Sequence, residues 1–212
     1  MDYSSPLGME FREVRDVEHD GEPARAAEGS RFYSTERDDL WDALTSAERL
    51  PRWFLPIRGD LRLGGRYHLE GNAEGTITRC DPPEVLEVTW EYGGNVSWVS
   101  LRLTPENGGT RLTLVHTMPK DEAGEAHWAT YGPGAVGVGW DLSFFGLGLH
   151  LASDGEAIDR EANDEWLTSD PGRVFLRACA ESWGRAHAAA GEDAQVAEAM
   201  AARTASFFAG DG

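Results

Sequence analysis

The sequence has few cysteines, and their placement excludes several kinds of site. Only Cys80 and Cys179 occur in 212 residues, and neither belongs to a CxxC pair or to a Cys/His cluster. A cysteine-based metal site needs such spacing. We therefore expect two free thiols in a reducing cytoplasm, and no metal or cofactor.

Basic residues are also scarce. The chain has 19 Lys and Arg against 37 Asp and Glu, which is a formal net charge of −18. Nucleic acids and anionic membranes are bound by clustered Lys and Arg. The balance therefore argues against a nucleic-acid partner and against membrane binding, and its plainest effect is solubility.

Targeting and membrane signals are weak. The first residues lack the basic and apolar regions of a signal peptide, which predicts a cytoplasmic protein. Residues 131–151 are about long enough to span a bilayer. They contain Asp141, His150 and several glycines, and no basic flank follows them. A buried core helix without membrane insertion is the better prediction.

Motifs of catalysis are missing as well. The sequence has no convincing nucleophile–base pair, paired carboxylate motif, phosphate loop or GxSxG. The glycines of 132–139 lack the strand and helix that flank a dinucleotide-binding loop. No defined reaction is predicted.

The most apolar stretch of the chain is 134–151, GAVGVGWDLSFFGLGLHL. Trp140, Phe144 and Leu147 recur at three- and four-residue steps, which predicts a helix. Glycine in a helix interior costs about 1 kcal/mol against alanine. The glycines at 137, 139, 146 and 148 therefore indicate close approach of the helix backbone to the sheet, to a ligand or to another subunit. Tight helix–sheet packing is slightly favoured.

The residues before this helix alternate with period two from position 60 onward. Leu86, Val88 and Trp90 alternate with polar residues, which is typical of a half-buried strand. Asn107-Gly108-Gly109 is one of several hairpin signals. Five short strands therefore form a predicted antiparallel meander, with the helix covering one face.

The remaining segments divide the chain into three parts. Residues 1–24 are expected to be an irregular N-terminal segment, and 25–151 one domain that begins with a strand and two short helices. Residues 119–133 are expected to be a loop and 153–167 a polar connection. Helices beginning at Asp170 and Asp193 form a helical extension over 152–212.

Several short motifs in 25–151 resemble the START-like (SRPBCC) superfamily, in the branch of the activator of heat shock protein 90 ATPase. The matching runs follow the family's order: Ala43-Leu44-Thr45 with Glu48-Arg49 and Arg52-Trp53-Phe54, 59–67, 75–77, 82–86 with Thr89-Trp90, 109–114 with His116, and Gly139-Trp140 with Leu149-His150-Leu151. The extension goes beyond the usual end of the family.

The resemblance implies an α+β helix-grip fold, in which a curved antiparallel sheet wraps around one long helix and leaves a cavity between them. Members bind lipids, hormones or polyketides, and a few are cyclases, hydrolases or co-chaperones. A fold by itself does not identify a function.

Strand parity and helical spacing point one set of side chains toward this space. A mostly apolar pocket is typical of a small-molecule site, although each of these side chains taken singly is more simply a core residue. The predicted cavity residues are Trp53, Phe54, Tyr67, Leu69, Ile77, Val88, Trp90, Leu101, Leu114, His116, Trp140 and Phe144.

His116 is the most notable polar residue of this set. It is either a hydrogen-bonded core histidine, which is the favoured interpretation, or a functional residue that acts as a hydrogen-bond donor or as a general base near neutral pH. Tyr67 and Trp90 have polar tips that could orient a ligand. Asp141 is expected to face solvent, with a buried polar partner as the alternative.

The sequence therefore predicts a protein that binds a small hydrophobic or amphipathic ligand without a defined reaction. One alternative is a cyclase- or hydrolase-type enzyme that uses His116 with Tyr67 or Asp141. Another is a co-chaperone-like module that stimulates a chaperone ATPase. A homodimer through the C-terminal helices is left open.

Overall fold

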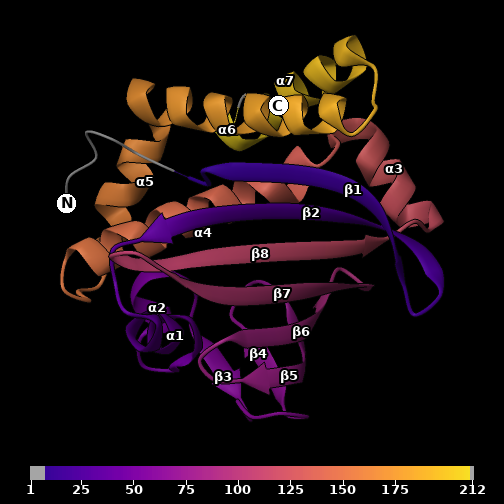
Figure 1. Cartoon of the computed structure of the whole chain (residues 1–212). Helices are drawn as coiled ribbons and strands as arrows, with labels where there is room; N and C mark the ends of the chain where they lie inside the picture. The colour runs from indigo at the N-terminus through magenta and orange to yellow at the C-terminus, as the bar shows by residue number, and fades with distance from the viewer. Residues whose placement is uncertain (1–7, 211–212) are drawn as a thin grey trace.

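The main element of the protein is one antiparallel sheet of eight strands, seen in the computed structural model, which describes residues 8–210 (Figure 1). The strands are β1 Phe11–His19, β2 Glu22–Tyr33, β3 Ile57–Gly59, β4 Arg66–Leu69, β5 Glu74–Asp81, β6 Val85–Tyr92, β7 Asn95–Glu106 and β8 Gly109–Pro119. Their spatial order is β1-β2-β8-β7-β6-β5-β4-β3. The sheet curves from β1 to the short strands β3 to β5 (Figure 1).

The helices divide between the concave side of the sheet and the C-terminal extension. Their bounds are α1 Arg37–Thr45, α2 Leu50–Trp53, α3 Glu122–Tyr131, α4 Gly134–Ala152, α5 Arg160–Thr168, α6 Asp170–Ala189 and α7 Ala194–Ala209. Helix α4 crosses the sheet, and α6 runs beside the edge strand β1 (Figure 1). An unpaired strand edge is a template for aggregation, so α6 also shields this edge.

The N-terminal segment contains a strand that the sequence analysis did not predict. β1 pairs with β2 over its whole length, from Phe11 opposite Ser30 to His19 opposite Glu22. Asp20 and Gly21 join them with φ values of 52° and 82°. An Asp-Gly pair with two positive φ angles is a strong hairpin turn, so the signal was present in the sequence. The expectation of an irregular segment was therefore wrong for the described residues, whereas residues 1–7 lie outside them.

Two further segments are helical where no helix was expected. Asp121 caps α3 by accepting a hydrogen bond from the Gly124 amide, and Asp159 caps α5 by accepting one from Ala162. A capping aspartate satisfies one of the free N–H groups at a helix start. The predicted loop at 119–133 is therefore mostly helix, and the polar segment 153–167 contains most of α5.

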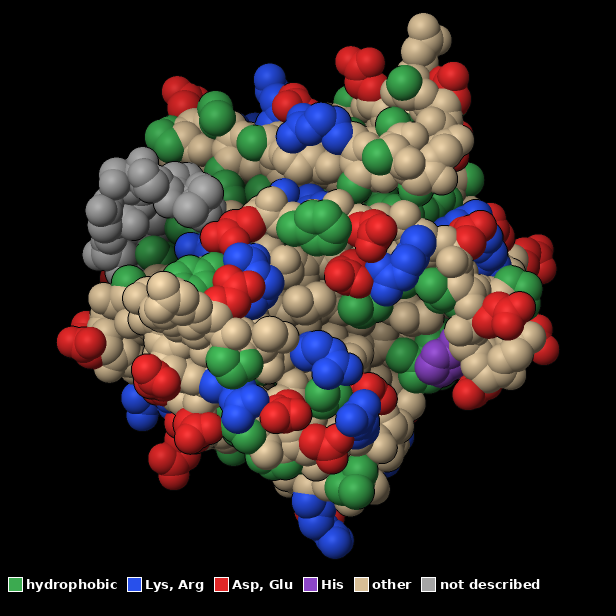
Figure 2. Space-filling model, viewed as in Figure 1, with side chains coloured by type: hydrophobic (Ala, Val, Ile, Leu, Met, Phe, Trp, Pro, Cys, Tyr) green, Lys and Arg blue, Asp and Glu red, His purple; other side chains and the backbone are tan. Residues whose placement is uncertain are grey.

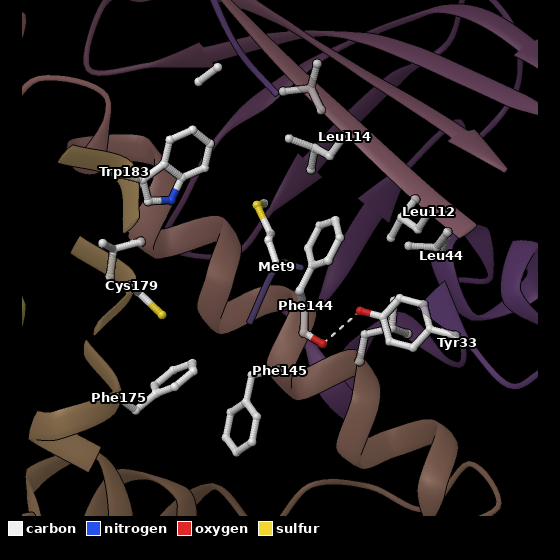
Figure 3. Close-up of a cluster of buried hydrophobic side chains, with 14 of the residues drawn as sticks. Met9, Tyr33, Leu44, Leu112, Leu114, Phe144, Phe145, Phe175, Cys179 and Trp183 are labelled. Atoms are coloured by element: carbon white, nitrogen blue, oxygen red, sulfur yellow. Dashed lines mark hydrogen bonds between the residues drawn. The ribbon is translucent and has the colours of Figure 1, made fainter. Parts of the chain in front are cut away.

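Helix α4 is covered on both sides. Its Phe144 points toward Leu112 and Leu114 of the sheet, whereas Phe145 points toward Phe175 of α6 (Figure 3). The Tyr33 hydroxyl of β2 donates a hydrogen bond to the Phe144 carbonyl over 2.8 Å. α4 is long and apolar enough to cross a membrane, but here it is the core helix.

The opposite face of the sheet is polar. Figure 2 shows basic and acidic side chains interspersed over the strands. Arg15 pairs with Glu28 across β1 and β2, and Arg111 pairs with Glu106. The predicted division into a covered face and a wet face is therefore present.

Together these elements form the helix-grip fold with a C-terminal helical extension, as predicted. One continuous core contains Leu112 of the sheet, Phe144 of α4 and Trp183 of α6. The extension therefore packs directly on the grip helix, and the space that remains lies between this helix and the sheet.

Candidate functional site

An apolar cavity of about 140 Å³ lies between the sheet and α4, closed at one end by α1 and α2. Eleven of the twelve predicted cavity residues line it. They are Trp53, Phe54, Tyr67, Leu69, Ile77, Val88, Trp90, Leu101, Leu114, Trp140 and Phe144. Parity on the strands and three- and four-residue spacing on α4 brought these residues together, because both periods place side chains on one face.

The cavity also has lining residues outside the predicted set. They are Leu44, Thr45, Leu50, Ile57, Leu61, Cys80, Leu86, Val99, Leu112, Ser143 and Leu147. Leu86 and Leu112 follow the same strand parity, and Leu44 and Leu50 lie on apolar faces of short helices. Ile57 and Leu61 come from β3 and the turn after it, where the sequence shows no alternation.

Four polar side chains around the cavity are already bonded within the protein. The Tyr67 hydroxyl donates to the Thr89 carbonyl over 2.7 Å, and the Trp53 indole N–H donates to the Ala43 carbonyl over 2.9 Å. The remaining hydroxyls behave alike: Thr45 donates to Trp41 and Ser143 to Gly139. Burial also raises the pKa of Tyr67. The walls therefore offer apolar contact and little unsatisfied hydrogen bonding.

His116 does not line this cavity, which corrects the prediction. Its Nδ1 accepts a hydrogen bond from the Trp140 indole N–H over 3.0 Å, and its Nε2 lies 2.8 Å from Ser97 Oγ. An indole N–H is only a donor, so Nδ1 must be unprotonated and Nε2 carries the proton. Burial lowers the pKa of His116 to about 4. This is a neutral core histidine held by two bonds, and it matches the favoured interpretation.

Asp141 is fully buried, so the expectation that it faces solvent was wrong. Its carboxylate accepts hydrogen bonds from the Met9 amide over 2.6 Å and the Trp183 indole over 2.9 Å, and it pairs with Arg12 over 2.5 Å. It therefore connects the strand β1, α4 and α6. The alternative interpretation, a partner for buried polar groups, is the one observed.

The three residues of the predicted enzyme site are therefore not assembled. Tyr67 is bonded to β6, His116 is bonded between β7 and α4, and Asp141 faces α6. A catalytic set needs its groups within reach of one bound molecule. This arrangement provides no such set in the cavity.

The glycines of α4 have different neighbours. A methyl group on Gly137 would overlap the indole ring of Trp183, whereas one on Gly139 would meet nothing within 4 Å. Gly146 faces the Trp53 carbonyl, and Gly148 faces Arg31. The tightest approach is therefore to α6, not to the sheet as favoured.

Comparison with known families explains this architecture. The sequence model of "Activator of Hsp90 ATPase homolog 1-like protein" matches residues 34–149. The chain belongs to this family. The family, within the START-like superfamily, is the one that the sequence motifs resembled, and its helix-grip fold is the one observed. A search of curated proteins found no match.

Solved structures extend the family likeness beyond the matched region. The chain is similar to CalU16 from Micromonospora echinospora, at 30% identity over 86% of this chain and 98% of that chain, with a TM-score of 0.65. A solution structure of CalU16 gives 29% identity over 89% and 100%, with a TM-score of 0.67. A protein from Rhodobacter sphaeroides gives 25% identity over 66% and 99%, with a TM-score of 0.50.

The difference in coverage concerns the extension. Residues 1–152 are 152 of 212, or 72% of the chain, so a match over 86% must include part of the C-terminal helices. The match to the Rhodobacter protein covers a smaller share. CalU16 therefore shares with this chain more than the family domain.

Proposed function

We propose that this protein binds a small apolar molecule, or the apolar end of a larger one, in the cavity between the sheet and α4. The observation that carries the proposal is the cavity itself, whose walls are mostly apolar and whose Tyr67 hydroxyl and Trp53 indole N–H are bonded within the protein. Such a surface gains free energy when an apolar group replaces water or empty space. The family is one of ligand-binding folds, which supports the same proposal.

The volume limits the size of the buried group. An apolar cavity of about 150 Å³ in another protein stays dry and binds benzene. The present cavity, at about 140 Å³, is of this size. We therefore expect it to take a single ring or a short branched chain without rearrangement.

Fluorobenzene provides a direct test, because its ¹⁹F signal broadens and shifts on binding. The blocking variant is Val88→Trp, which places an indole in the cavity. The matched control is Val196→Trp on α7, where the valine is 41% exposed. Binding that is lost in the first variant and kept in the second supports the proposal. Equal binding in both would contradict it.

Cys80 offers an independent measurement, because it lines the cavity and is half-buried. Cys179 is buried, and this burial raises the pKa of its thiol. Alkylation at neutral pH should therefore reach Cys80 first, since the thiolate is the reactive form. Fluorobenzene should slow alkylation of Cys80. Native mass spectrometry of freshly purified protein should show any molecule that is already bound.

The predictions on a chaperone partner, on cellular location and on oligomeric state need their own tests. Stimulation of a chaperone ATPase stays a prediction, motivated by the family name, and a direct ATPase assay with the chaperone would test it. A cytoplasmic location and a homodimer through the C-terminal helices also stay predictions. Cell fractionation and sedimentation analysis would test them.

A further inference from the structure

A second cavity, of about 460 Å³, lies at the other end of α4. It is open to solvent, because Tyr92 in its wall is 60% exposed, and it is bordered by the β6–β7 hairpin, the start of β2, the end of β8, helix α3 and the first turn of α4. Its walls include Arg25, Tyr92, Ser97, His116, His127 and Trp128. These residues provide aromatic faces together with imidazole and guanidinium groups, which the first cavity lacks.

The same strands run from one cavity to the other. On β8, Leu114 lines the first cavity and His116, two residues later, lines the second. On β6, Val88 lines the first, Trp90 lines both, and Tyr92 lines the second. Residues two apart on a strand point to the same face. The two cavities therefore lie one after the other along the same face of the sheet.

Helix α4 shows the same continuity. Val136, Trp140 and Phe144 are spaced by four residues and lie on one stripe. Val136 lines the second cavity, whereas Trp140 and Phe144 line the first. The stripe therefore passes from one cavity to the other without leaving the sheet side of the helix.

Three rings form the partition between the cavities. The rings of Trp90 and Trp140 meet edge to face with centroids 5.1 Å apart, and His116 lies 5.9 Å from Trp140. The Trp140 indole N–H donates to His116 Nδ1. One hydrogen bond and ring contacts therefore hold the partition closed.

The surroundings of Trp140 leave room for its side chain to move. Both tryptophans of the partition are only half-buried. A rotation of the Trp140 indole would break its hydrogen bond to His116 and its ring contacts with Trp90, His116 and Phe54.

The second cavity favours a different kind of chemical group from the first. The Arg25 guanidinium lies over the Trp128 ring, 4.7 Å from its centroid, and pairs with Glu125. Ser97 Oγ bonds to His116 and to the Trp90 carbonyl. These Ser97 and His116 bonds are already made within the protein, whereas the His127 imidazole is exposed. Aromatic faces beside this imidazole and the Arg25 guanidinium suit an aromatic group that carries oxygen acceptors.

We propose that the two cavities are chambers of one binding site, filled together by a single amphipathic ligand after Trp140 has moved. The compact apolar end occupies the first chamber, and a larger aromatic part with hydrogen-bonding oxygens occupies the second. The inference rests on the proposed function, because the apolar end is the group assigned there to the first cavity.

Two probes and two blocking variants test the inference. Fluorobenzene fits the first chamber alone. The larger probe, 8-anilinonaphthalene-1-sulfonate, has two ring systems and a sulfonate, and is long enough to span both chambers. Val88→Trp blocks the first chamber, and Ala135→Trp blocks the second. Near-ultraviolet circular dichroism and urea unfolding establish that each variant is folded before titration.

We expect Val88→Trp to weaken both probes and Ala135→Trp to weaken only the anilinonaphthalene probe, each by roughly tenfold or more. If only one variant weakens the larger probe, the cavities are separate sites and the inference is overturned. If fluorobenzene does not bind the wild type, the proposed function is overturned instead. Loss of binding of the larger probe in both variants would even then support the joined site.

The partition has its own test in Trp140→Phe, which keeps a ring but removes the N–H that bonds His116. Opening then breaks no hydrogen bond, so the larger probe should bind about fivefold more tightly. Trp98→Phe, where the ring stacks on His19 outside both cavities, is the matched control and should leave the affinity unchanged. An unchanged or weaker affinity in Trp140→Phe would contradict a closed partition that opens on binding.

Discussion

The two sides of α4 differ in how completely they are packed. Toward α6, Gly137 lies against the Trp183 indole, and the buried Asp141 is bonded to Met9, Arg12 and Trp183. Toward the sheet, large aromatic and aliphatic side chains leave a cavity of about 140 Å³. One helix therefore has a filled side and an underfilled side.

This difference separates stability from binding. Protein interiors are normally packed as densely as organic crystals, so a persistent void forgoes contacts that a ligand could make. The filled side anchors α4 and the N-terminal strand to the extension. Because contacts with α6 and β1 stabilise the position of α4, the protein stays folded with a cavity on the sheet side of this helix.

The largest expected loss of stability comes from a substitution on the filled side of α4. Asp141→Ala would leave Arg12, whose side chain is 12% exposed, as a nearly buried charge without its carboxylate. Breaking one partner of a buried pair costs about 3–5 kcal/mol. Guanidinium unfolding measures the loss of unfolding free energy. The double variant Arg12→Leu with Asp141→Ala should be less destabilised, and a loss below about 1 kcal/mol in the single variant would refute the anchoring role.

The polar group beside the cavity gives a pH-dependent effect. His116 has its pKa lowered from 6.5 to about 4 by burial. Between pH 6.5 and pH 4, His116 is therefore protonated in the unfolded chain but not in the folded one. The free energy of unfolding falls as the pH falls through this range. The loss is about 3 kcal/mol in total.

His116→Asn is the control, because an amide oxygen can accept from Trp140 but does not titrate. Urea unfolding near pH 7 and near pH 4 should show a smaller acid loss in this variant than in the wild type. Other buried histidines titrate in both proteins, so only the difference is informative. Equal losses in both would show that His116 is not the group responsible.

Adding one methyl group at two glycines compares the packing behind α4 with the open space beside it. Gly137→Ala would press on the Trp183 ring and should cost about 1–3 kcal/mol. Gly139→Ala meets nothing within 4 Å and should stabilise the helix by up to about 1 kcal/mol. Thermal unfolding of both variants measures the contrast. Equal destabilisation at the two positions would show that the space at Gly139 is not open.

The smallest expected effect comes from one methylene group on the underfilled side. Val88→Ile points into the cavity and should be neutral or stabilising by up to about 0.8 kcal/mol. Val138→Ile makes the same change at a fully buried position of α4 and should destabilise by about 1–3 kcal/mol. Denaturant midpoints compare the two. A loss of stability in Val88→Ile would indicate that the cavity is smaller than the structure shows.

Much of the sheet side followed from local pattern. Alternation along β6 and β8 and helical spacing around Trp140 and Phe144 were enough to predict most of the cavity lining, because a short period determines which face a side chain takes. The family motifs predicted how these faces are brought together. His116 lies on the predicted face of the sheet but on the far side of Trp140 from the first cavity. Strand parity predicts the face that a side chain takes, but not where along the strand it lies relative to α4.

The filled side was far less predictable. Helix α4 is apolar around most of its circumference, so its sequence does not show which side meets which layer. Asp141 was therefore predicted to face solvent. Its actual partners come from β1 and α6, which are distant in sequence and include a strand whose Asp20-Gly21 turn was overlooked.

From the sequence alone came the elements with a clear period, the family and the apolar character of the space between sheet and helix. These depend on neighbours within a few residues and on composition. The tertiary structure decided the volume of that space, its division by Trp90, His116 and Trp140, and the burial of Asp141. Each of these depends on how large side chains from separate elements fit together, which no local period records.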